Sequence, residues 1–233
     1  PSLKELIPRG FVDIHSHILP GIDDGAKNIE ESLELISKMK NLGFSKIIGT
    51  PHTYPGLYEN TNKTINNSFR ELKGKIPKGI EISYASEYMA DISILEKIKK
   101  NEILTLKDKY ILIETSFNSM PNDLFELIFE IRLKGFIPII AHPERYIYMF
   151  ENFKIIEKLK IMGCLFQINL LSSTGYYGSK VIIFSDQLLK NNIIDFVASD
   201  IHNIRHIEGF ENKIKIKNIQ KFNEAIERNK IFK

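Results

Sequence analysis

The stretch FVDIHSHILPGIDDG, residues 11–25, joins the end of an apolar run to two histidines and an acidic turn. Side chains two residues apart on an extended chain project the same way, so His15 and His17 point together. A strand that only packs in a core has no need of two imidazoles at its end. The stretch therefore predicts a buried strand whose C-terminal end carries a binding site.

Length and composition limit the alternatives. The chain has 233 residues and is 43% hydrophobic, enough for a sizeable core, and we expect one domain over residues 1–233. Its net charge is only +3, from 32 basic and 29 acidic residues, which gives no support to a nucleic-acid partner or a membrane surface. No apolar run reaches the ~18 residues of a membrane span, so no membrane insertion is expected.

The N-terminal residues and the single cysteine bear on location. PSLKELIPRGF, residues 1–11, lacks the apolar segment of a signal peptide. Cys164 has no partner for an internal disulfide, and a lone cysteine within an apolar run is typical of a buried small side chain in a reducing compartment. We therefore expect a cytoplasmic protein.

Short apolar runs alternate with segments of helical spacing along the whole chain. The runs predict seven strands, at residues 11–15, 46–50, 80–85, 110–115, 137–141, 164–170 and 195–199. The segments between them predict helices, most clearly at residues 29–43, 121–135, 153–163 and 179–192. Regular alternation of this kind is typical of an α/β fold with a parallel sheet and outer helices, either a barrel or an open doubly wound sheet.

Polar residues collect at the C-terminal ends of six of the seven runs. The histidines and carboxylates at these ends are His15, His17, Asp24, His52, Glu87, Glu114, His142, Asp200 and His202. Parallel strands end on the same side of a sheet, and in a β/α barrel that side is where the active site is built, so these residues are expected to converge. Each residue alone is more often structural, but the joint pattern is hard to explain by packing.

The residue types indicate which ligand would be bound. Imidazoles and carboxylates without a thiolate suit divalent Mn, Fe, Zn or Mg. Nine ligands exceed the four to six that one ion takes, and with bridging carboxylates they fit two or three ions. Clusters of this kind hold phosphoryl groups and generate hydroxide at neutral pH. Arg145, in the segment AHPER, adds a planar cation suited to phosphate.

The segments FVDIHSHILPGIDDG, TPH, ASEY, ILIETS, AHPERY and ASDIHN resemble, in the same order, those of the PHP (polymerase and histidinol phosphatase) superfamily. Within it they look like the bacterial capsular and exopolysaccharide-locus tyrosine-protein phosphatases of the CpsB/YwqE type. The resemblance runs from about Phe11 to His202. It implies a TIM-like, distorted (β/α)7 barrel that holds three metal ions, with manganese as the first candidate.

The resemblance also implies roles for individual residues. The nine residues at the strand ends would be metal ligands, Glu87 and Glu114 would bridge ions, and Arg145 would bind the phosphate. Many members carry a second arginine after the segment matched by ASDIHN; here Arg205 or His206 would have to fill that place, and His206 is a candidate proton donor. The loops at residues 53–60 and 171–178 are aromatic and rich in glycine, and we expect Tyr54 and Tyr176 to contact the substrate.

The predicted function is therefore metal-dependent hydrolysis of phosphotyrosine, with a metal-bound hydroxide attacking phosphorus and no cysteine nucleophile. The implied partner is a tyrosine kinase of polysaccharide assembly, so the enzyme would regulate capsule or exopolysaccharide synthesis. One alternative is a small-molecule phosphomonoesterase of the same superfamily, acting on histidinol phosphate or a sugar phosphate. Another is a weakly catalytic protein that docks on a kinase.

Overall fold

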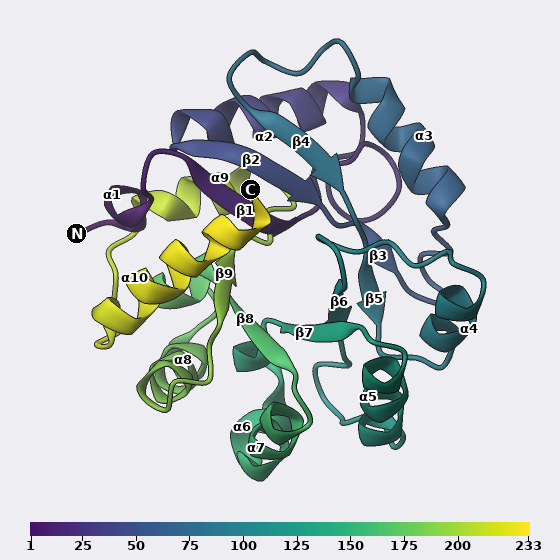
Figure 1. The fold of residues 1–233 in the computed structure, drawn as a ribbon. Helices are drawn as coiled ribbons and strands as arrows, with labels where there is room; N and C mark the ends of the chain where they lie inside the picture. The colour runs from purple at the N-terminus through teal and green to yellow at the C-terminus, as the bar shows by residue number, and fades with distance from the viewer.

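A computed structural model describes residues 1–233 and shows strands arranged around a central axis with helices outside them (Figure 1). Each of the seven predicted runs contains a strand. The strands are β1 (Phe11–Ser16), β2 (Phe44–Gly49), β3 (His52–Thr53), β4 (Glu81–Tyr84), β5 (Glu87–Met89), β6 (Tyr110–Glu114), β7 (Ile137–Ala141), β8 (Leu165–Asn169) and β9 (Phe196–Ala198). All neighbouring strands pair in parallel, as predicted for an α/β fold.

After the second and third predicted runs a short additional strand follows, and this divides the strands into two sheets. One sheet has the order β1-β2-β4 and the other β3-β5-β6-β7-β8-β9. Thr50 and Pro51 separate β2 from β3, and proline has no N–H to donate to a ladder. Ala85 and Ser86 separate β4 from β5, and Glu87 resumes pairing by donating its N–H to the Pro51 carbonyl at 3.1 Å. The short strands β3 and β5 carry His52 and Glu87 at their first positions.

The helices lie outside the strands (Figure 1). The four predicted helices are confirmed as α2 (Ile29–Asn41), α5 (Leu124–Leu133), α7 (Lys154–Ile161) and α8 (Ser179–Lys190). The Asn28 side chain caps α2 by accepting a hydrogen bond from the Glu31 N–H. The remaining α-helices are α1 (Leu3–Leu6), α3 (Asn62–Leu72), α4 (Ser93–Lys99), α6 (Ile147–Glu151), α9 (Ile204–Glu208) and α10 (Ile219–Arg228). Short 3₁₀ helices are η1 (Pro143–Arg145), η2 (Leu170–Thr174), η3 (Gly209–Glu211) and η4 (Asn229–Phe232).

Apolar side chains pack on both faces of the strands, which is why the runs are nearly continuous in hydrophobicity. A large cluster of 49 buried residues fills the space between strands and helices. A second cluster of 11 buried residues takes the alternate strand positions, such as Val12 and Ile14 of β1, and includes no residue of the outer α-helices. This inner cluster fills the interior below the polar C-terminal ends of the strands, so those ends rest on a packed layer.

Strands β1 and β9 meet at a seam that no continuous ladder closes. At the C-terminal end the backbone bridges them, with the Asp200 N–H donating to the His15 carbonyl and the His17 N–H to the Ile201 carbonyl, both at 2.9 Å. At the other end Asn229 of η4 donates to the carbonyls of Val12 and Val197 and accepts from the Val197 N–H. The expected seven β/α units are therefore present, but no continuous ladder joins β1 to β9, and Asn229 of the C-terminal segment hydrogen-bonds to both strands.

Candidate metal centre

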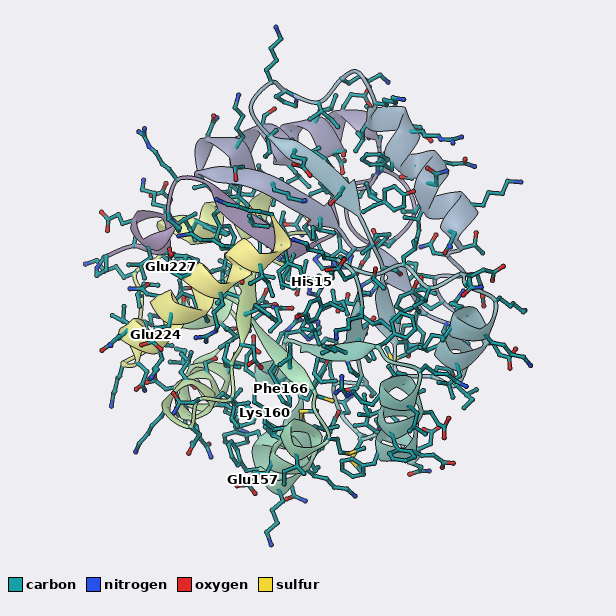
Figure 2. All side chains as sticks on the ribbon, in the orientation of Figure 1. His15, Glu157, Lys160, Phe166, Glu224 and Glu227 are labelled. Carbon is teal, nitrogen blue, oxygen red and sulfur yellow. The ribbon has the colours of Figure 1, made fainter.

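The nine predicted ligands come together at the C-terminal ends of the strands. Figure 2 shows His15 near the middle of the ring, whereas the labelled Glu157, Glu224 and Glu227 lie toward its edge. Glu87 is at the centre of the cluster and is fully buried. Its Oε2 lies 3.1 Å from His15 Nε2, 3.1 Å from His52 Nδ1 and 3.4 Å from His17 Nε2, and its Oε1 lies 3.0 Å from His142 Nε2. One carboxylate thus faces four imidazoles.

The cluster contains three overlapping groups whose candidate ligand atoms lie within 4.8 Å of one another. One group joins His15, His17 and Glu87, and another joins His52, Glu87 and Glu114. The third is nearer to solvent and consists of His17, Asp24, His52 and His202. His142 and Asp200 lie outside these groups, but His142 contacts Glu87, and Asp200 Oδ1 lies 3.4 Å from both His15 Nε2 and His17 Nε2.

The charges in the cluster depend on one another. Burial opposes ionisation of Glu87, but His15 and His52 hold its pKa well below the usual range. Burial opposes protonation of His15, yet Glu87 and Asp200 raise its pKa. Burial and the Glu87 carboxylate raise the pKa of Glu114. Carboxylates buried this close together need positive charge beside them. Protons on the imidazoles or bound cations can supply that charge.

The donor set fits divalent cations. Glu87 Oε2 is buried and receives no hydrogen bond, although three imidazole nitrogens surround it. His15 Nε2 and His17 Nε2 lie 3.1 Å apart, a distance at which one ion can contact both. The ligands are imidazoles and carboxylates without a thiolate, the types preferred by Mn, Fe, Zn and Mg. The residues therefore fit the metal ions expected from the sequence.

Strand β8 carries no predicted ligand, but its two buried amides orient His15. Asn169 Nδ2 donates to Asp200 Oδ2 at 2.7 Å, so its Oδ1 is left to accept from Gln167 Nε2 at 2.9 Å. Gln167 Oε1 then accepts from His15 Nδ1 at 2.9 Å. Because a carboxylate only accepts, this chain has one direction and leaves His15 Nε2 as the ligand atom. Neither amide was predicted as a site residue, although the two are the only polar side chains of the run CLFQINL.

The acidic turn after β1 has a second role that the sequence analysis did not assign. Asp23 Oδ2 accepts from His17 Nδ1 at 2.7 Å, which turns Nε2 toward Glu87, and also accepts from the His52 N–H. Asp24, the predicted ligand, instead lies 3.4 Å from His52 Nε2 and 3.5 Å from His202 Nε2. The turn packs tightly on β1, since a Cβ at Gly25 would lie 2.0 Å from the His17 carbonyl oxygen.

Two of the predicted ligands have left-handed backbone conformations. His142 has φ 32° and directly follows β7, and Asp200 has φ 50° and lies two residues after the end of β9. Such values are unfavourable for residues other than glycine and tend to occur where a side chain must be held in an unusual direction. They turn the side chain of His142 toward Glu87 and that of Asp200 toward His15.

A pocket of about 300 Å³ opens above this cluster. Its lining includes three carboxylates, Asp24, Glu114 and Asp200, and one permanent cation, Arg145. Arg145 donates from NH1 to Asp200 Oδ2 at 3.0 Å, and its side chain is 25% exposed. The remaining lining residues are His52, Phe117, His142, Tyr177, His202, Asn203 and His206.

The other predicted contact residues are placed less favourably than Arg145. His206 lines the pocket, and its Nδ1 lies 3.0 Å from the Asp200 carbonyl. Burial and His202 lower the pKa of His206. Arg205 is exposed on α9, and neither Tyr54 nor Tyr176 lines the pocket. The aromatic residues near the site are instead Tyr58, which stacks on His52, and Phe117 and Tyr177 in the pocket wall. Sequence spacing identified the loops but not which ring points inward.

Comparison with known families gives one match over nearly the whole chain. Residues 11–228 match the family described as capsular polysaccharide synthesis, CpsB/CapC. Tyrosine-protein phosphatase YwqE of Bacillus subtilis (strain 168) is 36% identical over 205 residues, covering 84% of this chain and 78% of the relative. Tyrosine-protein phosphatase CpsB of Streptococcus pneumoniae is 34% identical over 203 residues, covering 83% of this chain and 84% of the relative.

Solved structures agree with this match. A crystal structure described as that of YwqE from Bacillus subtilis and CpsB from Streptococcus pneumoniae, "unique metal-dependent tyrosine phosphatases", has a TM-score of 0.75 at 33% identity and covers 90% of this chain and 83% of that one. A histidinol phosphate phosphatase from Lactococcus lactis has a TM-score of 0.52 at 15% identity, covering 95% and 92% of the two chains, which shows the shared fold alone.

Proposed function

This chain belongs to the CpsB/CapC family of capsular polysaccharide synthesis proteins, and on that premise we propose that it is a metal-dependent tyrosine-protein phosphatase. The observation that carries the proposal is the pocket in which Arg145 lies over the cluster centred on Glu87. The nine residues predicted from the strand ends would hold two or three divalent ions, with manganese first and Fe, Zn or Mg as alternatives. We also propose that residues 1–233 act as one domain.

The charge of the pocket supports the requirement for metal. A phosphomonoester is a dianion near neutral pH, whereas Asp24, Glu114 and Asp200 place three carboxylates in the pocket wall against one arginine. Without further positive charge this wall would repel the substrate. Divalent ions bound to the cluster would supply that charge and lower the pKa of a water nucleophile.

Arg145 is proposed to bind the phosphate. Only its NH1 is engaged within the protein, by Asp200, so the other guanidinium N–H groups remain for phosphoryl oxygens. A planar guanidinium suits bidentate contact with phosphate and favours the charge that develops in the transition state. Of the two residues predicted to assist it, only His206 lines the pocket, and we propose that its ring hydrogen-bonds the oxygen of the leaving phenolate.

The substrate is proposed to be phosphotyrosine in a protein, and the partner a tyrosine kinase of polysaccharide assembly. The relatives are named tyrosine-protein phosphatases, and the family is described by capsular polysaccharide synthesis. None of the helices has the length and hydropathy needed to span a bilayer. We propose a cytoplasmic location on the basis of the single cysteine in the chain.

The two alternative functions have less support. A small-molecule phosphatase is expected to surround its compact anionic substrate with several cationic groups, but Arg145 is the only lysine or arginine of the pocket wall. A docking protein has no use for a buried cluster of converging imidazoles and carboxylates. The proposed function therefore accounts for more of the observed site than either alternative.

The first test compares the wild type with His142→Ala, each stripped of metal and reloaded with Mn. We expect Mn-dependent hydrolysis of p-nitrophenyl phosphate and of a phosphotyrosine peptide by the wild type, loss of both in the variant, and preference for the peptide over sugar phosphates. Preference for a sugar phosphate would favour the small-molecule alternative. If the protein binds metal ions but hydrolyses no phosphomonoester with any of them, the docking-protein alternative is favoured.

A further inference from the structure

The guanidinium of Arg145 lies between two aromatic rings that the sequence analysis did not assign to the site. Its Cζ is 4.8 Å from the centre of the Phe117 ring and 4.5 Å from the centre of the Tyr177 ring. Both distances are within the range of a cation–π contact, which is strongest where the cation is shielded from water. Asp200 holds the same guanidinium from its edge through NH1. Arg145 is thus held by two aromatic rings and by a hydrogen bond from NH1.

Hydrogen bonds connect the segments of both rings to the turn that carries Arg145. On one side, the Ile147 N–H donates to the Phe117 carbonyl at 3.0 Å. On the other, Glu144 Oε1 accepts from the Asn169 N–H and the Ser172 hydroxyl, which fixes the turn to the segment leading to Tyr177. Residues on either side of Arg145 in sequence therefore tie its turn to the segments that supply the two rings.

We propose that Phe117 and Tyr177 are positioning residues that hold the Arg145 guanidinium between their rings, ready to receive a phosphoryl group. The inference rests on the proposed function and adds two residues to it. Arginine side chains lose several rotamer degrees of freedom when they bind an anion, and a side chain already fixed loses less. The Tyr177 ring, not its hydroxyl, carries the role, because that hydroxyl is buried and inaccessible to a ligand.

The test replaces each ring by leucine and keeps the ring in a second variant. Phe117→Leu and Tyr177→Leu are expected to weaken binding of inorganic phosphate to the Mn-loaded enzyme roughly three- to tenfold, because each loses one cation–π contact. Tyr177→Phe and Phe117→Tyr should bind within twofold of the wild type. Phe150→Leu is the matched control, since Phe150 is 39% exposed like Phe117 but lies outside the pocket wall. Binding is measured by titration calorimetry, and kcat and KM are measured with p-nitrophenyl phosphate.

The leucine substitutions are repeated with Arg145→Met, which removes the cation. If the rings act through Arg145, they should have no further effect on phosphate binding in that background. An equal effect in both backgrounds, unchanged phosphate affinity in both leucine variants, or a loss in Tyr177→Phe as large as in Tyr177→Leu would overturn the role of the rings while leaving the phosphatase in place. A wild type that neither hydrolyses phosphomonoesters nor binds phosphate would refute the proposed function as well.

Discussion

Replacing Gln167 by leucine should weaken metal binding although it replaces no proposed ligand. Gln167 is fully buried and links His15 Nδ1 to Asn169, whose amide in turn donates to Asp200. Leucine is close in size but can neither accept from His15 nor donate to Asn169. Residues that orient metal ligands typically contribute 10- to 100-fold to affinity, so we expect Mn binding to weaken roughly 10- to 100-fold.

The substitution also leaves two buried polar groups unpaired, His15 Nδ1 and Asn169 Oδ1. At about 1–3 kcal/mol each, the free energy of unfolding of the metal-free protein should fall by about 2–6 kcal/mol. Manganese affinity is measured by titration calorimetry on the stripped protein, and stability by urea unfolding of the same sample. Asn229→Ala serves as the control, because it destabilises the far end of the seam without contacting the cluster.

A weaker affinity in Gln167→Leu with an unchanged affinity in Asn229→Ala would assign the effect to His15. The opposite result has a clear meaning too. If Gln167→Leu binds Mn as tightly as the wild type, the amide chain does not determine which His15 nitrogen faces the cluster, and the reasoning from hydrogen-bond direction fails.

Three further predictions concern other parts of the chain. Asn229→Ala should lower the free energy of unfolding, measured by urea unfolding, by about 1–3 kcal/mol per backbone group left unpaired. A change below about 0.5 kcal/mol would show that η4 does not stabilise the contact between β1 and β9. Gly25→Ala should displace the acidic turn and weaken Mn binding at least tenfold in calorimetry, because the added Cβ meets the His17 carbonyl; wild-type affinity would contradict this. Burial raises the pKa of the Cys164 thiol to about 12, so the folded protein retains a proton that the unfolded chain loses near pH 8.5. The free energy of unfolding should therefore fall by up to ~1.4 kcal/mol per pH unit between about pH 9 and 12. Cys164→Ala should lack this contribution in unfolding curves across that range and keep full phosphatase activity; lost activity would point to thiol chemistry.

The fold was predictable from the sequence where the spacing of apolar residues was regular. The seven apolar runs each contain a strand, and the four helices with clear spacing are present. Helix α3 was missed because NKTINNSFREL is mostly polar, although its buried residues Ile65, Ser68 and Leu72 have helical spacing. Strands β3 and β5 are too short to produce an alternating pattern, and only the ladder shows them.

The site was predictable in part, for a similar reason. Ligands at strand ends follow from one rule, that parallel strands end on the same side, and the nine predicted residues lie together. Residues that support them follow no such rule. Asp23 and Gln167 are recognisable only when the direction of each hydrogen bond is known. Likewise, the sequence identifies the loop at residues 171–178, but only the structure shows that Tyr177, and not Tyr176, stacks on Arg145.

The position of the cluster on the seam connects metal binding with folding. Two proposed ligands, His15 and His17, belong to β1 and the residue that follows it, and two others, Asp200 and His202, follow β9. Between these strands the backbone provides only a few bridging hydrogen bonds, and the side chains of Asp13, Ser199 and Asn229 add others. Ions bound by residues of both pairs would join β1 to β9 where the ladder does not. A ligand that binds only the folded state increases the stability of that state. The polar residues that interrupt the apolar pattern of FVDIHSH would thus serve the fold as well as the chemistry.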